Sequence, residues 1–243
     1  MDVIILTGGR GRRLGALTLH QPKANLHFAG KSLLMHTFSA LEGSEHLIQH
    51  VYVATGYMAE SVETQYRHEA IKASSKIPVT FLPFEPELSG TFGSVIWALR
   101  AATMVNTCLV IGIDVIITQR AMSELIASIR DDAPTTFLVS PLLTIAPTHG
   151  HIRLSQSSAM LEYRKYSMHA KKSSWHSWYS DVGIRYFSAD FVEECRSLSL
   201  TGACDFDDII PSLVNKGRIF NTHMLNERWL HFAGSRDFSQ KPL

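Results

Sequence analysis

Glycines and cations near the N-terminus have the types and order that the phosphates of a nucleotide require. Gly8, Gly9 and Gly11 follow a short apolar, β-branched run. Glycine has no Cβ, so main-chain N–H groups at these positions can approach a phosphate closely. Arg13 and Lys23 can add charge-assisted hydrogen bonds to its oxygens. The segment therefore predicts a phosphate-binding loop at the edge of a sheet.

Asp114 is a second candidate for chemistry, because it directly follows the apolar run 109–113. Ligands of open α/β sheets bind outside the carboxyl ends of the strands, so this carboxylate should face the same site as the glycine loop. A carboxylate that continues a buried strand is costly unless it is paired, hydrogen-bonded or bound to a metal. The position predicts either a ligand for a hard divalent cation or a helix-capping or salt-bridged carboxylate.

The glycine loop fits neither of two common phosphate-binding motifs. The dinucleotide-binding fingerprint requires a small residue where Leu14 stands, and Gly30-Lys31-Ser32 lacks the upstream glycine of a P-loop. The whole order is different: Gly8-Gly9-Arg10-Gly11-Arg12-Arg13-Leu14, then Leu17-Thr18, Pro22-Lys23 and Gly30-Lys31-Ser32-Leu33-Leu34. This order resembles the sugar nucleotidyltransferases, also called nucleotide-sugar pyrophosphorylases. The segment 85–93 resembles the loop that lies against the nucleobase in that family.

The resemblance implies roles for residues in each part of the site. Arg13 and Lys23 would be the catalytic cations. Asp114, in the context Gly112-Ile113-Asp114, would bind Mg²⁺ or Mn²⁺. The residues that would contact the nucleotide are Leu6, Gly8, Gly9, Gly11, Gly90 and Thr91. Those that would contact the acceptor are Gly150, Lys165, Asp181 and His231.

Three positions on the acceptor side depart from the family pattern. Arg164 replaces a glutamate, Asp181 replaces the asparagine that usually contacts sugar hydroxyls, and His231 replaces an aspartate that is a second metal ligand. Imidazole is a poor ligand for a hard cation, so Asp114 and phosphates hold the metal with water, or Asp181 substitutes, or activity is reduced. Plain surface charges at positions 164 and 181, and a packing role for His231, also stay open. For His231 we favour a contact with the acceptor.

Hydrophobic periodicity predicts an α/β fold. Helices are predicted at 33–41, 59–68, 92–102 and 121–129, and strands at 3–6, 50–54, 79–82, 107–111 and 136–140. Further along we expect strands at 151–154, 159–163, 182–187 and 218–223 and helices at 189–198, 206–216 and 235–238. The pattern predicts a mixed, mainly parallel sheet with helices on both faces. The resemblance implies the Rossmann-like, GT-A-type arrangement of these elements.

Length and charge limit the class of protein. The chain has 243 residues and 45% hydrophobic content, and no linker divides it. We therefore expect a single nucleotidyltransferase domain over 1–243, with a nucleotide-binding half at 1–140 and an acceptor-binding half at 141–243. A formal net charge of +1 predicts neither nucleic acid nor a membrane as a partner. The basic and aromatic stretch 164–179 is interpreted as an acceptor lid or a contact in a homo-oligomer.

Cysteine usage predicts a reducing compartment. Cys108, Cys195 and Cys204 are odd in number and lack metal-ligand spacing, which favours reduced thiols and a cytoplasmic location. Cys108 lies in an apolar run and is expected to be a buried structural thiol. The N-terminal apolar run lacks the basic flank of a signal peptide, and no later run approaches the ~20 residues of a membrane span.

The combined pattern predicts an enzyme of the nucleotidyltransferase type, in which a sugar 1-phosphate attacks a nucleoside triphosphate with Mg²⁺ present. The departures on the acceptor side favour a heptose or a modified hexose. Two alternatives remain: a cytidylyltransferase for a non-sugar phosphate such as an alditol phosphate or phosphocholine, and a catalytically weak, nucleotide-sugar-binding regulatory subunit. The sequence leaves the base and the sugar open.

Overall fold

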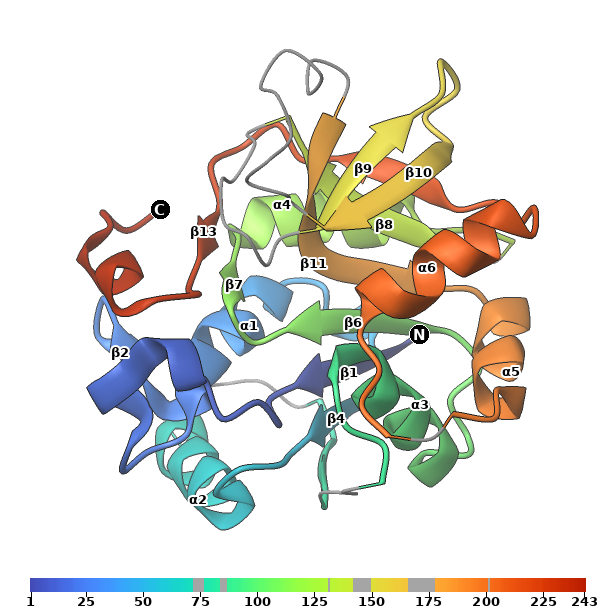
Figure 1. Ribbon diagram of the computed structural model, residues 1–243. Coiled ribbons are helices and arrows are strands. Elements are labelled where there is room, and N and C mark those ends of the chain that lie inside the picture. Colours follow the sequence, from blue (N-terminus) through green and yellow to red (C-terminus); the bar gives the residue numbers. More distant parts are fainter. Residues whose placement is uncertain (72–76, 84–86, 131, 142–149, 166–177, 201) are drawn as a thin grey trace.

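The fold is a mixed sheet with helices on both faces (Figure 1). The computed structural model describes residues 1–71, 77–83, 87–130, 132–141, 150–165, 178–200 and 202–243. In these residues the main path of the sheet runs β10 (Met160–Lys165), β9 (Gly150–Leu154), β11 (Trp178–Phe187), β6 (Cys108–Gly112), β1 (Asp2–Leu6), β4 (Val51–Ala54) and β5 (Val79–Leu82). Off this path, β8 (Thr136–Ser140) pairs with β11 and with β12 (Asn221–Met224). The predicted α/β fold class is confirmed.

The strands of the N-terminal half are parallel, and their carboxyl ends are level. β1 pairs with β4 on one side and β6 on the other, with Leu6 opposite Ala54 and Gly112. All three strands are buried on both faces, which is why they consist of near-continuous apolar residues. The segments that follow them, at residues 7, 55 and 113, therefore begin at one edge of the sheet.

The C-terminal half adds antiparallel strands to the same sheet. β11 runs antiparallel to β6, β8 and β9, so a strand of the second half lies directly beside the centre of the first. Its pairing with β8 shifts register between Asp181 and Arg185, and Gly183 between them has a φ of 90°. Such a bulge bends a strand and redirects its side chains, and this one lies next to the carboxyl end of β6.

Helices cover the sheet according to the alternation of β1. Val3 and Ile5 face a core that contains residues of α1 (Leu33–Leu41), α2 (Ala59–Ala70) and α4 (Gln119–Ser128). Ile4 faces the opposite core, with α3 (Thr91–Ala101), α5 (Ala189–Ser197) and α6 (Phe206–Asn215). Successive side chains of a strand point to opposite faces, so one apolar run supplies both cores.

Several elements were not predicted. Most are runs of two or three residues, which carry no periodic signal, and the seven-residue η1 is a kinked 3₁₀ helix within the glycine-rich segment. They are β2 (His27–Phe28), β3 (Lys31–Ser32), β7 (Val115–Ile116) and β13 (Leu230–His231), and the 3₁₀ helices η1 (Arg12–Thr18), η2 (Lys23–Asn25) and η3 (Glu45–Leu47). The helix predicted at 235–238 is a 3₁₀ helix, η5 (Ser235–Ser239), and the strand predicted at 218–223 begins only at Asn221. β13 pairs with β7, which brings residue 231 beside residue 115.

Two further properties of the described residues are the burial of the cysteines and the length of the helices. Cys108, Cys195 and Cys204 are all buried and form no disulfide, and burial raises the pKa of the Cys108 thiol. The prediction that Cys108 is a buried thiol is confirmed. Among the helices that the structure describes, none combines the length and the apolar character that a membrane span needs.

Candidate active site

The first residues of the glycine loop are held against the loop that follows β4. The N–H of Tyr57 donates a hydrogen bond to the carbonyl oxygen of Gly8, at 3.2 Å. A Cβ at Gly56 would lie 2.4 Å from that same oxygen, so only glycine permits this approach. Thr7 adds two bonds from its N–H and its hydroxyl to the carbonyl oxygen of Ala54, at 2.9 and 3.0 Å. The start of the predicted phosphate loop is therefore fixed by residues 54–57.

The rest of the loop turns sharply at Gly11, which has a φ of 65° and starts η1. Its carbonyl oxygen accepts from the Leu14 N–H at 2.8 Å and the Thr18 hydroxyl at 3.0 Å. Tyr57 contacts the loop again, because the Arg10 guanidinium lies 5.0 Å from its ring centroid and its hydroxyl donates to the carbonyl oxygen of Leu19. These bonds close the segment 8–19 into one compact turn.

The cations of this segment differ in exposure. Arg13 lies in η1 with an exposed side chain, whereas Lys23 in η2 is buried. The Lys23 ammonium donates to Asp114 Oδ2 at 3.1 Å, across 91 residues of sequence. The structure therefore brings together the predicted catalytic lysine and the predicted metal ligand, on loops that leave the sheet at one edge.

His231 joins the same carboxylate. Its Nε2 lies 3.6 Å from Asp114 Oδ2. The pairing of β13 with β7 places it there, and the Phe232 N–H donates to the Asp114 carbonyl oxygen at 2.8 Å. A Cβ at Gly112 would approach Asp114 Oδ1 to 3.0 Å, so the glycine two residues earlier leaves room for the carboxylate.

The neighbours of Asp114 decide its charge. Burial opposes ionisation, but the Lys23 ammonium and the His231 imidazole outweigh it and hold the pKa of the carboxyl well below its usual range. The carboxylate is thus an anion, about a third of its side chain is exposed, and its two neighbours are almost covered. An anion with one open side can take a further cationic or hydrogen-bonding ligand.

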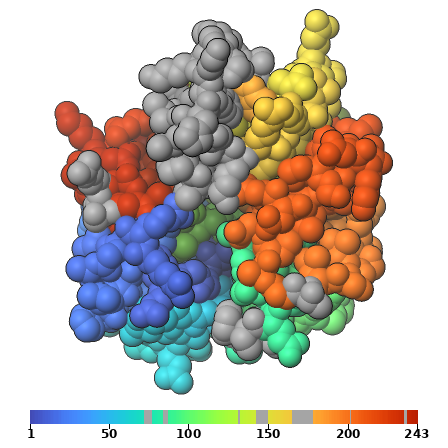
Figure 2. All heavy atoms as spheres, viewed as in Figure 1, coloured from blue at the N-terminus to red at the C-terminus, as the bar shows by residue number. Residues whose placement is uncertain are grey.

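A hollow opens at this edge of the sheet. Figure 2 shows it near the centre of the view, with dark blue atoms of the N-terminal segment and green atoms at its floor. Blue atoms of the first residues and orange atoms of the C-terminal half lie on opposite sides of it. The site is therefore a recess between the two halves of the chain.

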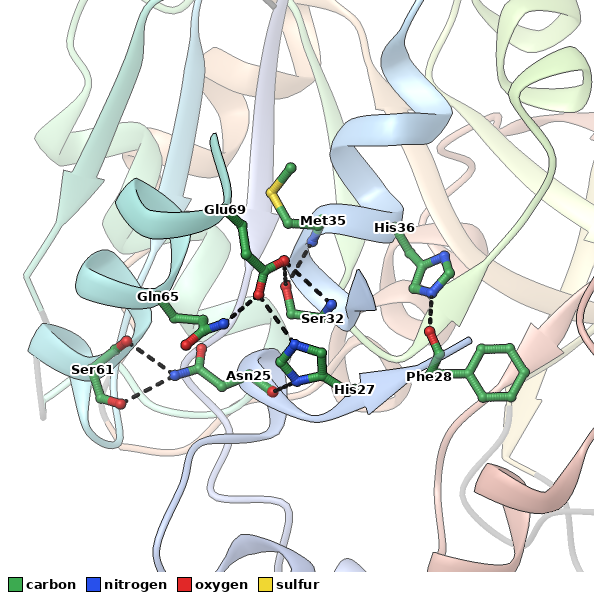
Figure 3. Close-up of polar contacts among 9 residues, drawn as sticks. All are labelled: Asn25, His27, Phe28, Ser32, Met35, His36, Ser61, Gln65 and Glu69. Carbon is green, nitrogen blue, oxygen red and sulfur yellow. Dashed lines mark hydrogen bonds and ion pairs between the residues drawn. The ribbon is translucent and has the colours of Figure 1, made fainter. Parts of the chain in front are cut away.

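The turn that carries Lys23 is held by polar contacts with α2 (Figure 3). The Asn25 amide donates to the backbone and the hydroxyl oxygens of Ser61, at 3.0 and 3.1 Å. His27 contacts the Asn25 carbonyl oxygen through Nδ1, and its Nε2 lies 3.4 Å from Glu69. These contacts at the end of η2 and just after it hold the turn from which Lys23 reaches Asp114.

Glu69 is the centre of this cluster. Its carboxylate accepts from Gln65 and from the hydroxyl of Ser32, at 3.0 Å for the latter. Burial opposes ionisation here too, but these donors and His27 lower the pKa of the Glu69 carboxyl below its ordinary value of 4.5. Glu69 therefore stays ionised and holds α2 to the start of α1.

The predicted nucleobase loop is held by the C-terminal half of the chain. Thr91 donates to Asp205 Oδ1 from its N–H at 2.7 Å and from its hydroxyl at 2.9 Å. Gly90 has a φ of 82°, and a Cβ there would lie 2.4 Å from the Cys204 carbonyl oxygen. The Thr91 hydroxyl, predicted to contact the base, is thus a donor to Asp205. Glu85 and Pro86 of the same motif lie outside the described residues.

The acceptor residues are only partly assembled. Asp181 is buried, and its carboxylate accepts from the hydroxyl of Tyr163, the N–H of Gly183 and the guanidinium of Arg185. It is therefore not a surface charge, and these donors occupy it. A Cβ at Gly150 would lie 2.1 Å from the Tyr163 hydroxyl, so the glycine makes room for that ring.

The remaining acceptor positions are described unevenly. Lys165 ends β10 opposite Gly150, which fixes its backbone. Arg164 is exposed and paired with Glu162, with its guanidinium 5.3 Å from the Trp178 ring centroid. Most of the stretch predicted to be a lid or a subunit contact, residues 166–177, lies outside the described residues, as does His149.

A divalent cation is compatible with this site if the ligand supplies most of its oxygens. Among the described residues, no three histidine, cysteine, aspartate or glutamate side chains gather into a metal site. Asp114 offers one carboxylate with an open side. Mg²⁺ is often bound by one or two carboxylates with substrate phosphates and water, and the phosphate loop lies at the same edge. The donor set fits a nucleotide-bound cation.

Sequence reasoning missed the residues that hold the site in place. Gly56, Tyr57, Asn25, Glu69 and Asp205 were not singled out, although each contacts a segment that was. The segment Thr55-Gly56-Tyr57 carried a usable signal, because a glycine directly after a strand often marks a close backbone approach. For Asn25, Glu69 and Asp205 the signal is absent, since their partners lie elsewhere in the sequence.

Comparison with known proteins identifies the family. The MobA-like NTP transferase domain matches residues 3–177. The chain belongs to this family, and the predicted membership of the sugar nucleotidyltransferases is confirmed.

Two relatives show how far the similarity extends. The D-glycero-alpha-D-manno-heptose 1-phosphate guanylyltransferase of Aneurinibacillus thermoaerophilus is 27% identical over 202 residues, which are 82% of this chain and 79% of that protein. The mannose-1-phosphate guanylyltransferase catalytic subunit beta of Danio rerio is 36% identical over 103 residues, 42% of this chain. The match spans only 27% of that longer protein.

Solved structures share the fold. The inositol-1-phosphate CTP transferase from T. maritima superposes with a TM-score of 0.76 at 14% identity, over 97% of this chain and 90% of that one. HddC from Yersinia pseudotuberculosis, complexed with GMP-PN, gives a TM-score of 0.72 at 17% identity, over 98% and 96%. At such identities the likeness is one of fold.

We predict that Gly56→Ala damages the glycine loop. The new Cβ would meet the Gly8 backbone at 2.4–2.5 Å, so the loop must move. We expect a loss of about 1–3 kcal/mol in the free energy of unfolding, as for other overpacked positions, together with weaker nucleoside triphosphate binding. Urea unfolding and binding titrations measure both. Gly9→Ala, whose Cβ meets nothing within 4 Å, is the control for stability. Equal stability of the two variants would contradict the close approach of Gly56 to Gly8.

We also predict that the stability provided by Glu69 depends on pH. Its pKa is lowered in the folded chain, so its contribution is present above the ordinary carboxyl pKa and is lost as the pH falls below it. At neutral pH, Glu69→Gln should cost about 1–2 kcal/mol, because hydrogen bonds to a charged group are the stronger ones. Urea unfolding of both proteins across acidic and neutral pH checks this. If the difference in the free energy of unfolding between the wild type and Glu69→Gln stays constant down to about pH 3, the prediction is contradicted.

Proposed function

We propose that this chain transfers a nucleoside monophosphate from GTP to a sugar 1-phosphate of the manno series, with release of pyrophosphate. The observation that carries the proposal is the contact of Lys23 with Asp114 at 3.1 Å, at the edge where the glycine loop also leaves the sheet. Guanine and a manno-configured acceptor are supported by the printed names of the two relatives. Of the departures from the family pattern, His231 is the position where a particular acceptor would be selected, because the buried Asp181 is already occupied by Tyr163, Gly183 and Arg185.

The proposed reaction is a single in-line displacement. An oxygen of the acceptor phosphate attacks the α-phosphorus of the triphosphate, the bond from that phosphorus to the bridging oxygen breaks, and pyrophosphate leaves on the opposite side. The attacking oxygen is already anionic, so no side chain has to remove a proton. The protein must instead overcome repulsion between two anions and stabilise charge on the phosphoryl oxygens.

The residues of the chain have distinct tasks in this mechanism. The turn 8–19 presents main-chain N–H groups to the triphosphate, and the exposed Arg13 can reach phosphates bound there. Lys23 is held by η2 beside Asp114 and would neutralise the α-phosphate. Asp114 would hold Mg²⁺ or Mn²⁺, which when bound would screen the phosphate charges. Lys23 then exchanges its bond to Asp114 for one to phosphate.

His231 fits a task on the acceptor side of Asp114. It lies on β13, comes from the second half of the chain and is mostly covered. An imidazole beside an ionised carboxylate can donate a hydrogen bond to an acceptor hydroxyl or phosphate while its other neighbours fix the ring.

The first test is a substrate screen. Each nucleoside triphosphate is paired with mannose 1-phosphate, a manno-heptose 1-phosphate, glucose 1-phosphate or an alditol phosphate, and pyrophosphate release is measured with Mg²⁺ and with a chelator. We expect release with GTP and a manno-configured acceptor, and none with the chelator. Release only with CTP and an alditol phosphate would support the cytidylyltransferase alternative. Nucleotide binding without release in any pair would favour a regulatory subunit.

The second test removes the cations. With the best pair from the screen, Lys23→Ala and Arg13→Ala should each lower turnover by about 100-fold or more, the scale for losing a charge partner of the transition state. Lys216→Ala, at an exposed lysine that follows α6, is the matched control. Thermal unfolding shows whether each variant is folded. Full turnover of a folded Lys23→Ala enzyme at saturating substrates would contradict the assignment.

A further inference from the structure

We propose that Asp205 is a positioning residue that sets nucleobase binding, because it holds Gly90 and Thr91 in the conformation that receives the base. The inference deepens the proposed function and rests on it. Asp205 belongs to the second half of the chain, immediately before α6, and 114 residues separate it from Thr91. It does not touch the nucleotide in this proposal and acts through the loop.

Several hydrogen bonds connect residues 204–205 with residues 89–93. Asp205 Oδ1 accepts both the N–H and the hydroxyl of Thr91. The N–H groups of Phe92 and Gly93 both donate to the Cys204 carbonyl oxygen at 3.0 Å, and the Cys204 N–H donates to Ser89 at 2.9 Å. The first three N–H groups of α3 are thus bonded to one foreign segment.

These bonds fix an unusual backbone conformation at Gly90. Gly90 has φ 82° and ψ 169°, a conformation that side chains do not favour. A Cβ there would lie 2.4–2.7 Å from three backbone atoms of Cys204. The segment 204–205 therefore fills the space on one side of Gly90 and fixes the conformation of the loop there.

The contact between the two segments can be located in the space-filling view. Figure 2 shows orange atoms of the 205–215 region beside green atoms of the region near residue 90, at the rim of the hollow. Asp205 is also attached to α6, because its own N–H donates to Asp208 Oδ2 at 2.8 Å. We call the contact of residues 204–205 with residues 89–93 the clamp. It lies at the rim of the hollow and is attached to α6.

The residue after Asp205 connects the clamp with the acceptor half of the chain. Phe206 follows Asp205 directly, and the Arg185 guanidinium lies 3.8 Å from the centroid of its ring. Arg185 is buried and paired with Asp181. Two adjacent residues thus contact the base loop and the buried pair of β11, so the position of the base loop is set relative to the acceptor strands.

The test is equilibrium binding of GTP and of the other nucleoside triphosphates, which needs no acceptor. We expect Asp205→Ala to weaken GTP binding by about tenfold, which is close to the contribution of one hydrogen bond to a charged group, and to reduce the preference for GTP over the other bases. Asp205→Asn keeps an acceptor oxygen and should bind close to wild type. Asp132→Ala, at an exposed carboxylate, is the control. Unchanged affinity and preference in a folded Asp205→Ala protein would overturn the proposal.

A double-mutant cycle separates positioning from direct contact. If Thr91 acts through Asp205, Thr91→Val should weaken binding, Thr91→Ser should not, and Thr91→Val should add nothing in the Asp205→Ala background. Additive effects would mean that the Thr91 hydroxyl meets the base itself, and would overturn the proposal. If Asp205→Ala does not fold, amide exchange of residues 89–94 in the ligand-free Thr91→Val protein decides, and exchange as slow as in wild type would overturn the proposal.

Amide hydrogen exchange distinguishes failure of this inference from failure of the proposed function. In the absence of any ligand, Asp205→Ala should speed exchange in the peptide that covers residues 89–94, and Asp205→Asn should not. Unchanged exchange would overturn the clamp. A wild-type chain that binds no nucleoside triphosphate would instead count against the proposed function, whatever the exchange result.

Discussion

The ion pair between Lys23 and Asp114 is the interaction on which the site depends. Asp114 follows a buried strand and keeps an ionised carboxylate, which would be costly without a cation beside it. The cation comes from a turn near the N-terminus, 91 residues away. That turn must therefore be fixed to about the precision of a hydrogen bond, and α2 supplies the fixing through Ser61, which accepts from Asn25, and Glu69, which pairs with His27. In the proposed reaction, Lys23 would leave Asp114 for a phosphate of the bound triphosphate, and Asp114 would then take the cation.

The histidine at position 231 changes the chemistry of this centre. The family pattern has a second carboxylate there, whereas this chain places an imidazole 3.6 Å from the first one. Two nitrogen groups now share one carboxylate, and both lower its pKa against the effect of burial. A cation at Asp114 would take its remaining ligands from phosphate and water, as Mg²⁺ commonly does. With His231 in place of a second carboxylate, a cation bound at Asp114 would depend on the nucleotide, and not on the protein, for its remaining ligands.

The acceptor half contains a second charged group of a different kind. Asp181 and Arg185 are buried together, where an unpaired charge would be strongly destabilising. Tyr163 and the N–H of Gly183 complete the hydrogen bonds of the carboxylate, and Phe206 covers the guanidinium. The pair thus stabilises the bulge at Gly183 and connects β11 with α6. An aspartate in place of the family's asparagine is explained by the arginine beside it.

The sequence by itself determined the elements and the chemistry of the loops. Short β-branched runs predicted β1, β5 and β8, three- and four-residue spacing predicted α1 to α6, and the glycines with Lys23 predicted a phosphate site. These signals are local, because side-chain periodicity and glycine geometry act within a few residues. Tertiary structure decided which residues meet: His231 with Asp114, Asp205 with Thr91, and α2 with the turn of Lys23. Strands of two residues and single hydrogen bonds between distant segments have no local pattern. They form only because the sheet, once packed, holds their partners within bonding distance.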